Sequence, residues 1–309
     1  MKKRILVVSS ANMDMVMNIN TVPSAGETVI ENGSYAYVPG GKGANSAVAI
    51  SRLGAECTFL TRVGNDANAN SLLELYKKEE IDISYIKKDD NAPTGLATIF
   101  VEKNGQNRII VFAGANQKID RETVSEALND APDALYMQFE INHDAILHAA
   151  NEAYKKGIPV FIDAGPADKT FPLEKLPRLE IFSPNETETL GFTGIAPTDD
   201  DACMRACLEL QKRIDAKYIV IKLGSKGAYV FDGEKGEMFP SYEIKAVDTT
   251  AAGDAFTAAL TLKYLQCQDI ALSCKFANCA GALTVSRHGA SSSIPSLDET
   301  QAFFEKVIM

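Results

Sequence analysis

Short apolar runs alternate with longer segments of helical periodicity along most of the chain. The apolar runs predict buried strands over residues 5–8, 58–63, 134–138, 160–163, 181–183 and 218–222, with a further strand at 229–231. Helical spacing predicts helices over residues 46–53, 70–79, 123–129, 144–156, 201–214, 255–265 and 270–285. This alternation is typical of the α/β class, so we expect a mainly parallel sheet flanked by helices.

Two regions interrupt this alternation. Residues 14–38 and 94–112 contain short strand-like stretches with no helix between them. Within the second region, residues 94–100 and 108–112 predict a hairpin. Strands outside the parallel pattern indicate a small separate sheet built from parts of these two regions. No repeat, low-complexity stretch or linker divides the sequence, so we expect one domain over residues 1–309.

Charge and cysteine content narrow the classes of function. A net charge of −10 argues against binding to nucleic acid or acidic membranes, for which a basic surface supplies the affinity. The six cysteines form no CxxC pair and fit a reducing cytoplasm. The apolar run after residues 1–4 is too short for a signal peptide, and no other run approaches the ~18 apolar residues of a membrane span. We therefore expect a cytoplasmic protein that acts on a small molecule.

Residues 248–254 form a predicted tight turn of small residues that opens directly into a helix. The unpaired amides of a first helical turn, together with the helix dipole, favour an anion. Asp254 adds a carboxylate at the same helix start, and amides beside a proton acceptor are what phosphoryl transfer to a hydroxyl requires. The alternative is an ordinary helix start in which Asp254 helps to cap the helix.

A second glycine-rich segment, residues 40–45 (GGKGAN), precedes another helical run. It is not a P-loop, which needs GxxxxGK[ST]. Lys42 and Asn45 contribute a cation and an amide there. Two such helix entries, far apart in sequence, indicate two parts of a ligand that meet in one cleft. The alternative is a glycine turn with a solvated lysine.

Candidate site residues follow several predicted strands at their carboxyl ends, where open parallel sheets bind ligands. These residues are Asn12, Asp14, Glu140, Asn185, Glu188 and Gly224. Carboxylates and amides exchange hydrogen bonds readily with the hydroxyls of a sugar. The alternative is that they are turn and helix-cap residues without a ligand.

Taken together, these segments resemble the ribokinase-like (PfkB-type) carbohydrate kinases nearly from end to end. The motifs that carry the resemblance are, in order, residues 12–14, 23–28, 40–45, 137–140, 185–188 (Asn-x-x-Glu), 222–227 and 248–254. The resemblance implies an ATP-dependent sugar kinase with a small β-sheet lid. Within the family, the pattern is most similar to the members that act on ribose, which implies transfer to the 5-hydroxyl of D-ribose to give ribose 5-phosphate and ADP.

The resemblance also implies roles for individual residues. Asp254 would be the catalytic base, and the anion hole would comprise Ala251, Ala252 and Gly253. The sugar would be bound by Asn12, Asp14, Gly41, Lys42, Asn45 and Glu140. Asn185 and Glu188 would hold Mg²⁺, mostly through water. The remaining ATP contacts would come from Asn185, Lys222, Gly224, Ser225, Gly227 and Asn278.

Two further features of the family carry over to this chain by resemblance. A monovalent cation, K⁺, would bind next to the anion hole at Asp248, Thr250, Thr284, Arg287, Gly289 and Ser293, although a plain surface loop is the alternative. The lid sheet would pair two subunits into a homodimer.

One departure from the family pattern concerns the sugar. Residues 163–167 read DAGPA, where the members that act on ribose usually have Asn-Pro-Ala-Pro-Ala, and Asp163 therefore adds a carboxylate near the phosphate side. Other kinases of the family, acting on deoxyribose, fructose, a ketodeoxy sugar acid or a nucleoside, remain alternatives. A non-catalytic sugar- or nucleotide-binding protein on the same fold is another, against which Asp254, Asn185 and Glu188 argue.

Overall fold

The main sheet has eight strands. The computed structural model describes residues 2–103 and 106–308. The strand order is β14 (Gly236–Phe239), β13 (Ala228–Phe231), β12 (Ala216–Lys222), β11 (Leu179–Ser183), β10 (Val160–Asp163), β9 (Ala134–Met137), β1 (Arg4–Val8) and β4 (Glu56–Leu60). In this sheet, strands β12, β11, β10, β9, β1 and β4 pair in parallel, whereas β13 and β14 extend the sheet in antiparallel pairing. The carboxyl ends of β1, β9, β10, β11 and β12 therefore meet along one edge.

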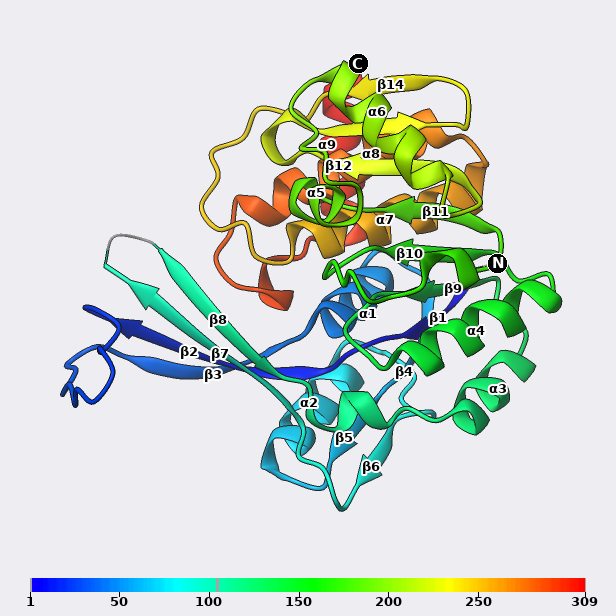
Figure 1. Ribbon diagram of the computed structural model, residues 1–309. Helices are drawn as coiled ribbons and strands as arrows, with labels where there is room; N and C mark the ends of the chain where they lie inside the picture. The colour runs from blue at the N-terminus through cyan, green and yellow to red at the C-terminus, as the bar shows by residue number, and fades with distance from the viewer. Residues whose placement is uncertain (1, 104–105, 309) are drawn as a thin grey trace.

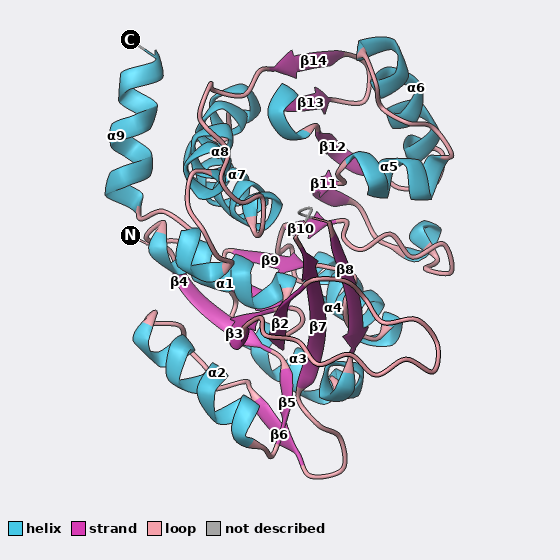
Figure 2. Ribbon diagram, turned by 90° about the vertical axis from the view of Figure 1, so that its left-hand side faces the viewer, coloured by secondary structure: helices cyan, strands magenta, loops and turns pink. Residues whose placement is uncertain are grey.

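Helices cover both faces of this sheet (Figure 2). One hydrophobic core lies under α1 (Lys42–Arg52), α2 (Ala67–Lys78), α7 (Ala252–Cys267), α8 (Ile270–Val285) and α9 (Leu297–Ile308). The other lies under α3 (Arg121–Asn129), α4 (His143–Lys155), α5 (Glu186–Thr193) and α6 (Asp200–Gln211). Strands buried on both faces must be apolar throughout, which explains the continuous apolar runs of the sequence. The predicted α/β class with a mainly parallel sheet is confirmed.

A second, four-stranded sheet projects from the side of the α/β body (Figure 1). Its order is β3 (Tyr35–Gly40), β2 (Asn12–Ile19), β7 (Gly95–Glu102) and β8 (Asn107–Phe112). Strands β7 and β8 pair antiparallel, which confirms the predicted hairpin. The short strand-like stretches of residues 14–38 and 94–112 thus supply most of this sheet.

The predicted strand over residues 58–63 is wrong in its second half. The main-sheet strand β4 ends at Leu60, and a separate strand β5 (Arg62–Gly64) pairs with β6 (Lys87–Asp89) instead. Arg62 explains the break, because its guanidinium pairs with Asp89 at 3.0 Å and Asp120 at 2.8 Å. An arginine with two carboxylate partners is poorly suited to a strand buried on both faces.

The helices at the two glycine-rich segments begin earlier than the sequence predicts. Helix α1 starts at Lys42 rather than at residue 46, and α7 starts at Ala252 rather than at residue 255. The candidate residues Lys42, Asn45 and Asp254 therefore lie on the first helical turns. The sequence also misses α5, α9 and β14. In the part of the chain that the structure describes, no helix is both long enough and apolar enough to cross a lipid bilayer.

Candidate active site

A cavity of about 950 Å³ lies at the carboxyl ends of β10, β11 and β12, against the start of α7. Its lining includes predicted residues from both glycine-rich helix entries, namely Lys42, Ala252, Gly253 and Asp254. It also includes the predicted residues Asn185, Glu188, Lys222, Gly224, Ser225, Gly227 and Asn278. Segments that lie far apart in sequence are thus brought to one place by the parallel sheet.

Asp254 lies in the first turn of α7, where the backbone amides have no partner within the helix. Ala251, the residue before α7, adopts a left-handed conformation with φ of 61°, and this turns the chain sharply into the helix. The Asp254 carboxylate is almost completely buried. It accepts hydrogen bonds from Asn45 Nδ2 at 2.9 Å and from Gln138 Nε2 at 3.3 Å. The carboxylate is therefore held in one orientation beside the amides of the first helical turn.

Burial dominates the electrostatics of this carboxylate. Removal from water raises the pKa of Asp254 to about 6, although the positive charge of Lys42 opposes the rise. In turn, Asp254 holds the pKa of Lys42 above its ordinary value, and burial opposes that effect. Asp254 is consequently ionised at neutral pH and titrates close to it, as a general base requires.

The residues predicted to bind the sugar lie near Asp254, and one of them, Lys42, also lines the large cavity. Gly41 has φ of 91° and precedes α1, and a Cβ there would come within 2.8 Å of the Asn12 backbone nitrogen. Glu140 accepts hydrogen bonds from Ser10 Oγ at 2.5 Å and from the Lys42 backbone nitrogen at 3.3 Å. The Oδ1 atom of Asn45 is buried without a partner. A ligand hydroxyl would satisfy it.

Asp14 and Asn12 lie on β2, at its junction with the main sheet. Burial, together with the negative charges of Glu140 and Asp254, raises the pKa of Asp14 to about 7. Asn12 makes a contact that the sequence did not predict, because its Oδ1 accepts a hydrogen bond from Asn116 Nδ2 at 2.7 Å. Asp14 and Asn12 lie outside the lining of the large cavity, on the side of the small sheet.

Asn185 and Glu188 form a capping box at the start of α5. The Asn185 side chain accepts a hydrogen bond from the Glu188 backbone nitrogen, and Glu188 Oε2 accepts one from the Asn185 backbone nitrogen, both at 2.8 Å. The helix-cap alternative is therefore correct as local geometry. Glu188 is nevertheless buried rather than exposed, and it lines the cavity. Its burial raises its pKa, although Lys222 and Lys42 oppose the rise.

These two side chains offer the oxygen ligands that Mg²⁺ prefers. Within residues 2–103 and 106–308, no group of three His, Cys, Asp or Glu residues lies close enough together to hold a metal ion. A divalent ion in this cavity would therefore take most of its ligands from water and phosphate, and two oxygen-bearing side chains suit that arrangement.

The predicted nucleotide loop follows β12. Gly224 and Gly227 have φ of 53° and 105°, and a Cβ at Gly227 would collide with the carbonyl oxygen of Phe239. Asn278 donates hydrogen bonds to the carbonyl oxygens of Phe239 and Pro240, both at 3.1 Å. Asn278 thus ties α8 to the segment after β14 while it also lines the cavity.

The residues predicted to bind a monovalent cation lie outside the cavity lining, in the segment before α7, at the end of α8 and in the segment that follows α8. Asp248 Oδ1 accepts hydrogen bonds from the Thr250 backbone nitrogen at 2.9 Å and from Thr250 Oγ1 at 2.6 Å. Asp248 Oδ2 accepts one from the Gly289 backbone nitrogen at 3.0 Å. Burial acts to raise the pKa of Asp248, but these hydrogen bonds hold it below its ordinary value.

The other three predicted cation ligands lie along the same segment. Thr284 and Ser293 are buried, and the Thr284 carbonyl accepts a hydrogen bond from the Arg287 backbone nitrogen at 3.2 Å. The Arg287 side chain pairs with Glu299. All of these groups offer carboxylate, hydroxyl or carbonyl oxygens, which suit a hard monovalent cation.

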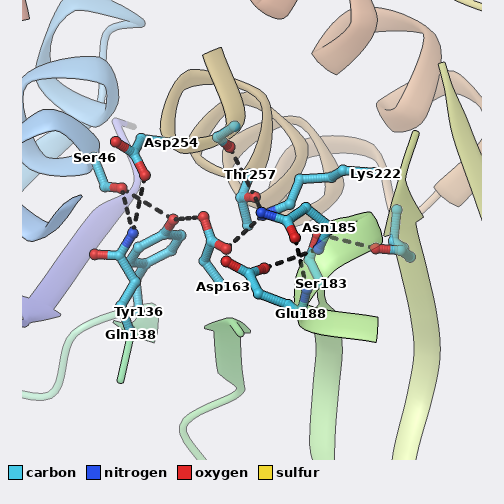
Figure 3. A network of polar contacts seen from close by, with 12 residues as sticks. Ser46, Tyr136, Gln138, Asp163, Ser183, Asn185, Glu188, Lys222, Asp254 and Thr257 are labelled. Atoms are coloured by element: carbon cyan, nitrogen blue, oxygen red, sulfur yellow. Dashed lines mark hydrogen bonds and ion pairs between the residues drawn. The ribbon is translucent and has the colours of Figure 1, made fainter. Parts of the chain in front are cut away.

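A buried polar network links Asp254 to Asp163 and Lys222 (Figure 3). Gln138 donates to Asp254 and to Ser46 Oγ, Ser46 and Tyr136 share a hydrogen bond of 3.1 Å, and Tyr136 contacts Asp163 at 3.5 Å. Asp163 pairs with Lys222, which lies in turn 3.2 Å from Thr257 Oγ1. Sequence reasoning missed Gln138, Ser46, Tyr136 and Thr257. Only the position of Gln138, inside the motif 137–140, could have indicated it.

Comparisons with known proteins bear on this site. Residues 2–297 match the model of the pfkB family carbohydrate kinases. The ribokinase of Staphylococcus aureus (strain COL) is 37% identical over 97% of this chain and 99% of its own length, and that of Haemophilus influenzae is 34% identical over 99% of both. The structure of Arabidopsis thaliana ribokinase complexed with ribose and ATP superposes with a TM-score of 0.90, at 30% identity and 99% coverage of both chains.

Proposed function

Because the chain belongs to the pfkB family of carbohydrate kinases, we propose that it transfers the γ-phosphoryl group of ATP to the 5-hydroxyl of D-ribose. The products are ribose 5-phosphate and ADP. The observation that carries the proposal is the position of Asp254, whose buried carboxylate lines the large cavity and accepts a hydrogen bond from the predicted sugar residue Asn45. The likeness to a ribokinase complexed with ribose and ATP supports the choice of both substrates.

In this proposal Asp254 accepts the proton of the 5-hydroxyl while that oxygen attacks the γ-phosphorus. The pKa of about 6 keeps the carboxylate ionised at neutral pH. Ala251, Ala252 and Gly253 surround the transferring group with backbone amides at the positive end of the α7 dipole. Lys42 adds a positive charge between the sugar and the phosphate sides. Catalysis is then mainly positioning and electrostatic stabilisation.

ATP occupies the large cavity in this proposal. Asn185, Lys222, Gly224, Ser225, Gly227 and Asn278 contact the nucleotide, and Asn185 and Glu188 hold Mg²⁺ mostly through its water shell. The metal would neutralise charge on the ATP phosphates. The buried position of Glu188, within a capping box that fixes its carboxylate, supports the assignment.

A monovalent cation, K⁺, binds beside the anion hole in the same proposal. Its ligands are the oxygens of Asp248, Thr250, Thr284, Arg287, Gly289 and Ser293. The hydrogen bonds that draw Asp248, Thr250 and Gly289 together support a site on this loop. Asp248 precedes the turn of residues 249–251, so an ion held there would order the start of α7.

The whole chain acts as one ribokinase-like domain in this proposal, and the four-stranded sheet forms a lid over the sugar. The two edge strands of that sheet, β3 and β8, expose large apolar side chains, at Tyr35, Tyr37, Ile109, Ile110, Val111 and Phe112. An exposed apolar patch of this kind is typical of an interface, which supports a homodimer formed through the lid. All six cysteines are free thiols, as expected of a cytoplasmic enzyme.

The test of the proposal is a substrate panel. ATP consumption would be coupled to ADP detection with D-ribose, 2-deoxyribose, fructose, a ketodeoxy sugar acid and a nucleoside, and kcat/KM compared. We expect D-ribose to give the highest value. A higher kcat/KM for any other acceptor would replace ribose as the substrate, and no turnover with any acceptor would favour a binding protein.

A further inference from the structure

The only lysine–carboxylate ion pair in which both side chains are almost completely buried, within the described residues, lies at the carboxyl ends of β10 and β12. Asp163 and Lys222 are the last residues of these strands. Only 4% of the Asp163 side chain and 10% of the Lys222 side chain is exposed to solvent. Both line the large cavity, together with Gly253 and Asp254. A buried ion pair that faces a ligand cavity is costly to maintain for stability alone, which favours a functional role for it.

The ammonium group of Lys222 lies next to the anion-binding turn. A Cβ added to Gly253 would come within 3.9 Å of Lys222 Nζ, with nothing nearer among the atoms around it. The electrostatic effect of Lys222 extends to both Asp254 and Glu188, because it lowers the pKa of each carboxyl against the effect of burial. Lys222 therefore lies between the proposed base, the anion hole and the proposed magnesium residue.

The hydrogen bonds of Lys222 leave one donor free for a ligand. An ammonium group has three N–H donors. Two of them are used by Asp163 and by Thr257 Oγ1, and Thr257 itself donates to the Gly253 carbonyl at 3.1 Å. Among the described residues, Lys222 Nζ has no third protein partner. These contacts tie the lysine both to β10 and to the turn that carries the anion hole (Figure 3).

Asp163 is in turn held from its other side. Its Oδ2 accepts a hydrogen bond from the Tyr136 hydroxyl at 3.5 Å, and Tyr136 is fixed by Ser46. Asp163 stands where the family members that act on ribose usually have the Asn of Asn-Pro-Ala-Pro-Ala. An asparagine at this position would keep a contact with Tyr136 but would leave the Lys222 charge unbalanced. The negative charge of Asp163 and the positive charge of Lys222 therefore balance each other.

We propose that Lys222 is a catalytic cation that contacts the transferring phosphoryl group, and that Asp163 is the positioning residue that holds it there. This inference rests on the proposed kinase function. The sugar 5-oxygen forms a bond to the γ-phosphorus, the bond from that phosphorus to the bridging oxygen breaks, and ADP leaves with the electron pair. Asp254 takes the hydroxyl proton. Lys222 keeps its own protons and stabilises the negative charge through the free N–H donor.

The test must separate this role from simple neutralisation of Asp163. Lys222→Met alone removes the cation but leaves Asp163 buried and unpaired, so both explanations predict a loss. The double variant Asp163→Asn/Lys222→Met restores the charge balance. If Lys222 contacts the phosphoryl group, kcat for D-ribose should stay down by about 10²–10³ in the double variant, as when one anion-hole donor is removed. Recovery to within about threefold of wild type would overturn the proposal.

Binding supplies a readout that does not depend on turnover. Calorimetric titration without sugar should show that Lys222→Met and the double variant lose affinity for ATP but keep the wild-type affinity for ADP, which lacks the transferred group. Equal losses for both nucleotides would overturn the role of Lys222. If wild type fails to phosphorylate any sugar, the proposed kinase function fails, and the ATP and ADP affinities still decide whether Lys222 contacts the γ-phosphate.

Two further variants complete the design. Asp163→Asn keeps Lys222 charged but loosens it, so kcat should fall by up to about 10² while KM for D-ribose holds. An unchanged kcat would remove Asp163 from the positioning role. Lys217→Met is the matched control, since Lys217 is near the start of the same strand, pairs with Glu180 at 2.7 Å and lies at the opposite edge of the sheet. This substitution also removes a lysine from an ion pair, and kcat should not change.

Discussion

Asp254→Asn separates catalysis from stability at one position. The substitution keeps the shape of the side chain and removes its charge. A positioned general base contributes about 10²–10⁴ to the rate, so kcat for sugar phosphorylation should fall by that factor. Affinity for magnesium-ATP should change little, because Asp254 faces the sugar residues as well as the cavity and carries no ligand role for the metal.

The effect on stability should have the opposite sign. Burial raises the pKa of Asp254 to about 6, and one pKa unit corresponds to about 1.4 kcal/mol, so the ionised carboxylate costs roughly 3 kcal/mol in the folded protein. The neutral amide that replaces the carboxylate in Asp254→Asn does not carry this free-energy cost. It also loses one acceptor for Asn45 or Gln138, but the unpartnered Oδ1 of Asn45 can rotate to accept from it. The variant should therefore be as stable as wild type at pH 7.5, or more stable.

The pH dependence follows from the direction of the pKa shift. A carboxyl group whose pKa is higher in the folded protein than in the unfolded chain stabilises the folded state. This contribution is complete only at pH values below the pKa in the unfolded chain, which is near 4. Wild type should lose that contribution as the pH rises to about 6, and the variant should not. The charged groups that face Asp254, from β2, α1, β10 and β12, are Asp14, Lys42, Asp163 and Lys222.

Steady-state kinetics and thermal unfolding between pH 4.5 and 8 would check both parts. The difference in Tm, variant minus wild type, should increase with pH over the range in which Asp254 ionises. Wild-type kcat should decline below about pH 6 as the base is protonated. A variant that retains kcat within about tenfold would remove Asp254 from the role of base. A Tm difference that shrinks with rising pH would contradict the explanation by burial.

Three other changes probe the remaining parts of the site. Glu188→Gln should raise the Mg²⁺ concentration needed for half-maximal activity, because a neutral amide holds the metal's water shell less well; an unchanged Mg²⁺ titration would reduce Glu188 to its capping role. Activity in K⁺ should exceed activity in Na⁺ through the loop at Asp248 and Gly289, whereas equal rates in K⁺, Na⁺ and a large organic cation would argue against a cation site there. Asp14 can accept hydrogen bonds from the 2- and 3-hydroxyls of ribose, so Asp14→Ala should lose most ribose activity. The variant should also lose the preference for ribose over 2-deoxyribose. Such a preference can reach ~10⁴, because an analogue without the hydroxyl leaves a buried polar group unpaired. If kcat/KM shows that wild type uses both sugars equally, or that the variant keeps the full preference, this placement of the sugar is wrong.

The alternation of apolar and polar residues determined the fold class and the location of most elements. Strands β1, β9, β10 and β12 lie where their apolar runs predict them, because a strand buried on both faces requires a nearly continuous run of apolar residues. Local signals failed where a short element lacked such a pattern. Helix α5 has eight residues and is defined by its Asn185–Glu188 cap rather than by an apolar stripe.

The glycine-rich segments and the residues at strand ends could likewise be recognised from sequence, since backbone freedom and polar side chains leave a local mark. What they contact could not. Gln138 and Tyr136 read as part of a buried strand, and Thr257 as one more residue of a helix. Their hydrogen bonds to Ser46, Asp163 and Lys222 join residues up to 92 positions apart, as between Gln138 and Ser46.

The sequence by itself therefore determined the α/β class, the two glycine-rich helix entries and the presence of a carboxylate at one of them. Only the tertiary structure decided that Asp163 is balanced by Lys222, and that Asp254 is buried enough to hold a pKa of about 6. The physical reason is that periodicity and turn chemistry act over a few neighbouring residues, whereas charge compensation and loss of water depend on which strand ends the parallel sheet brings together.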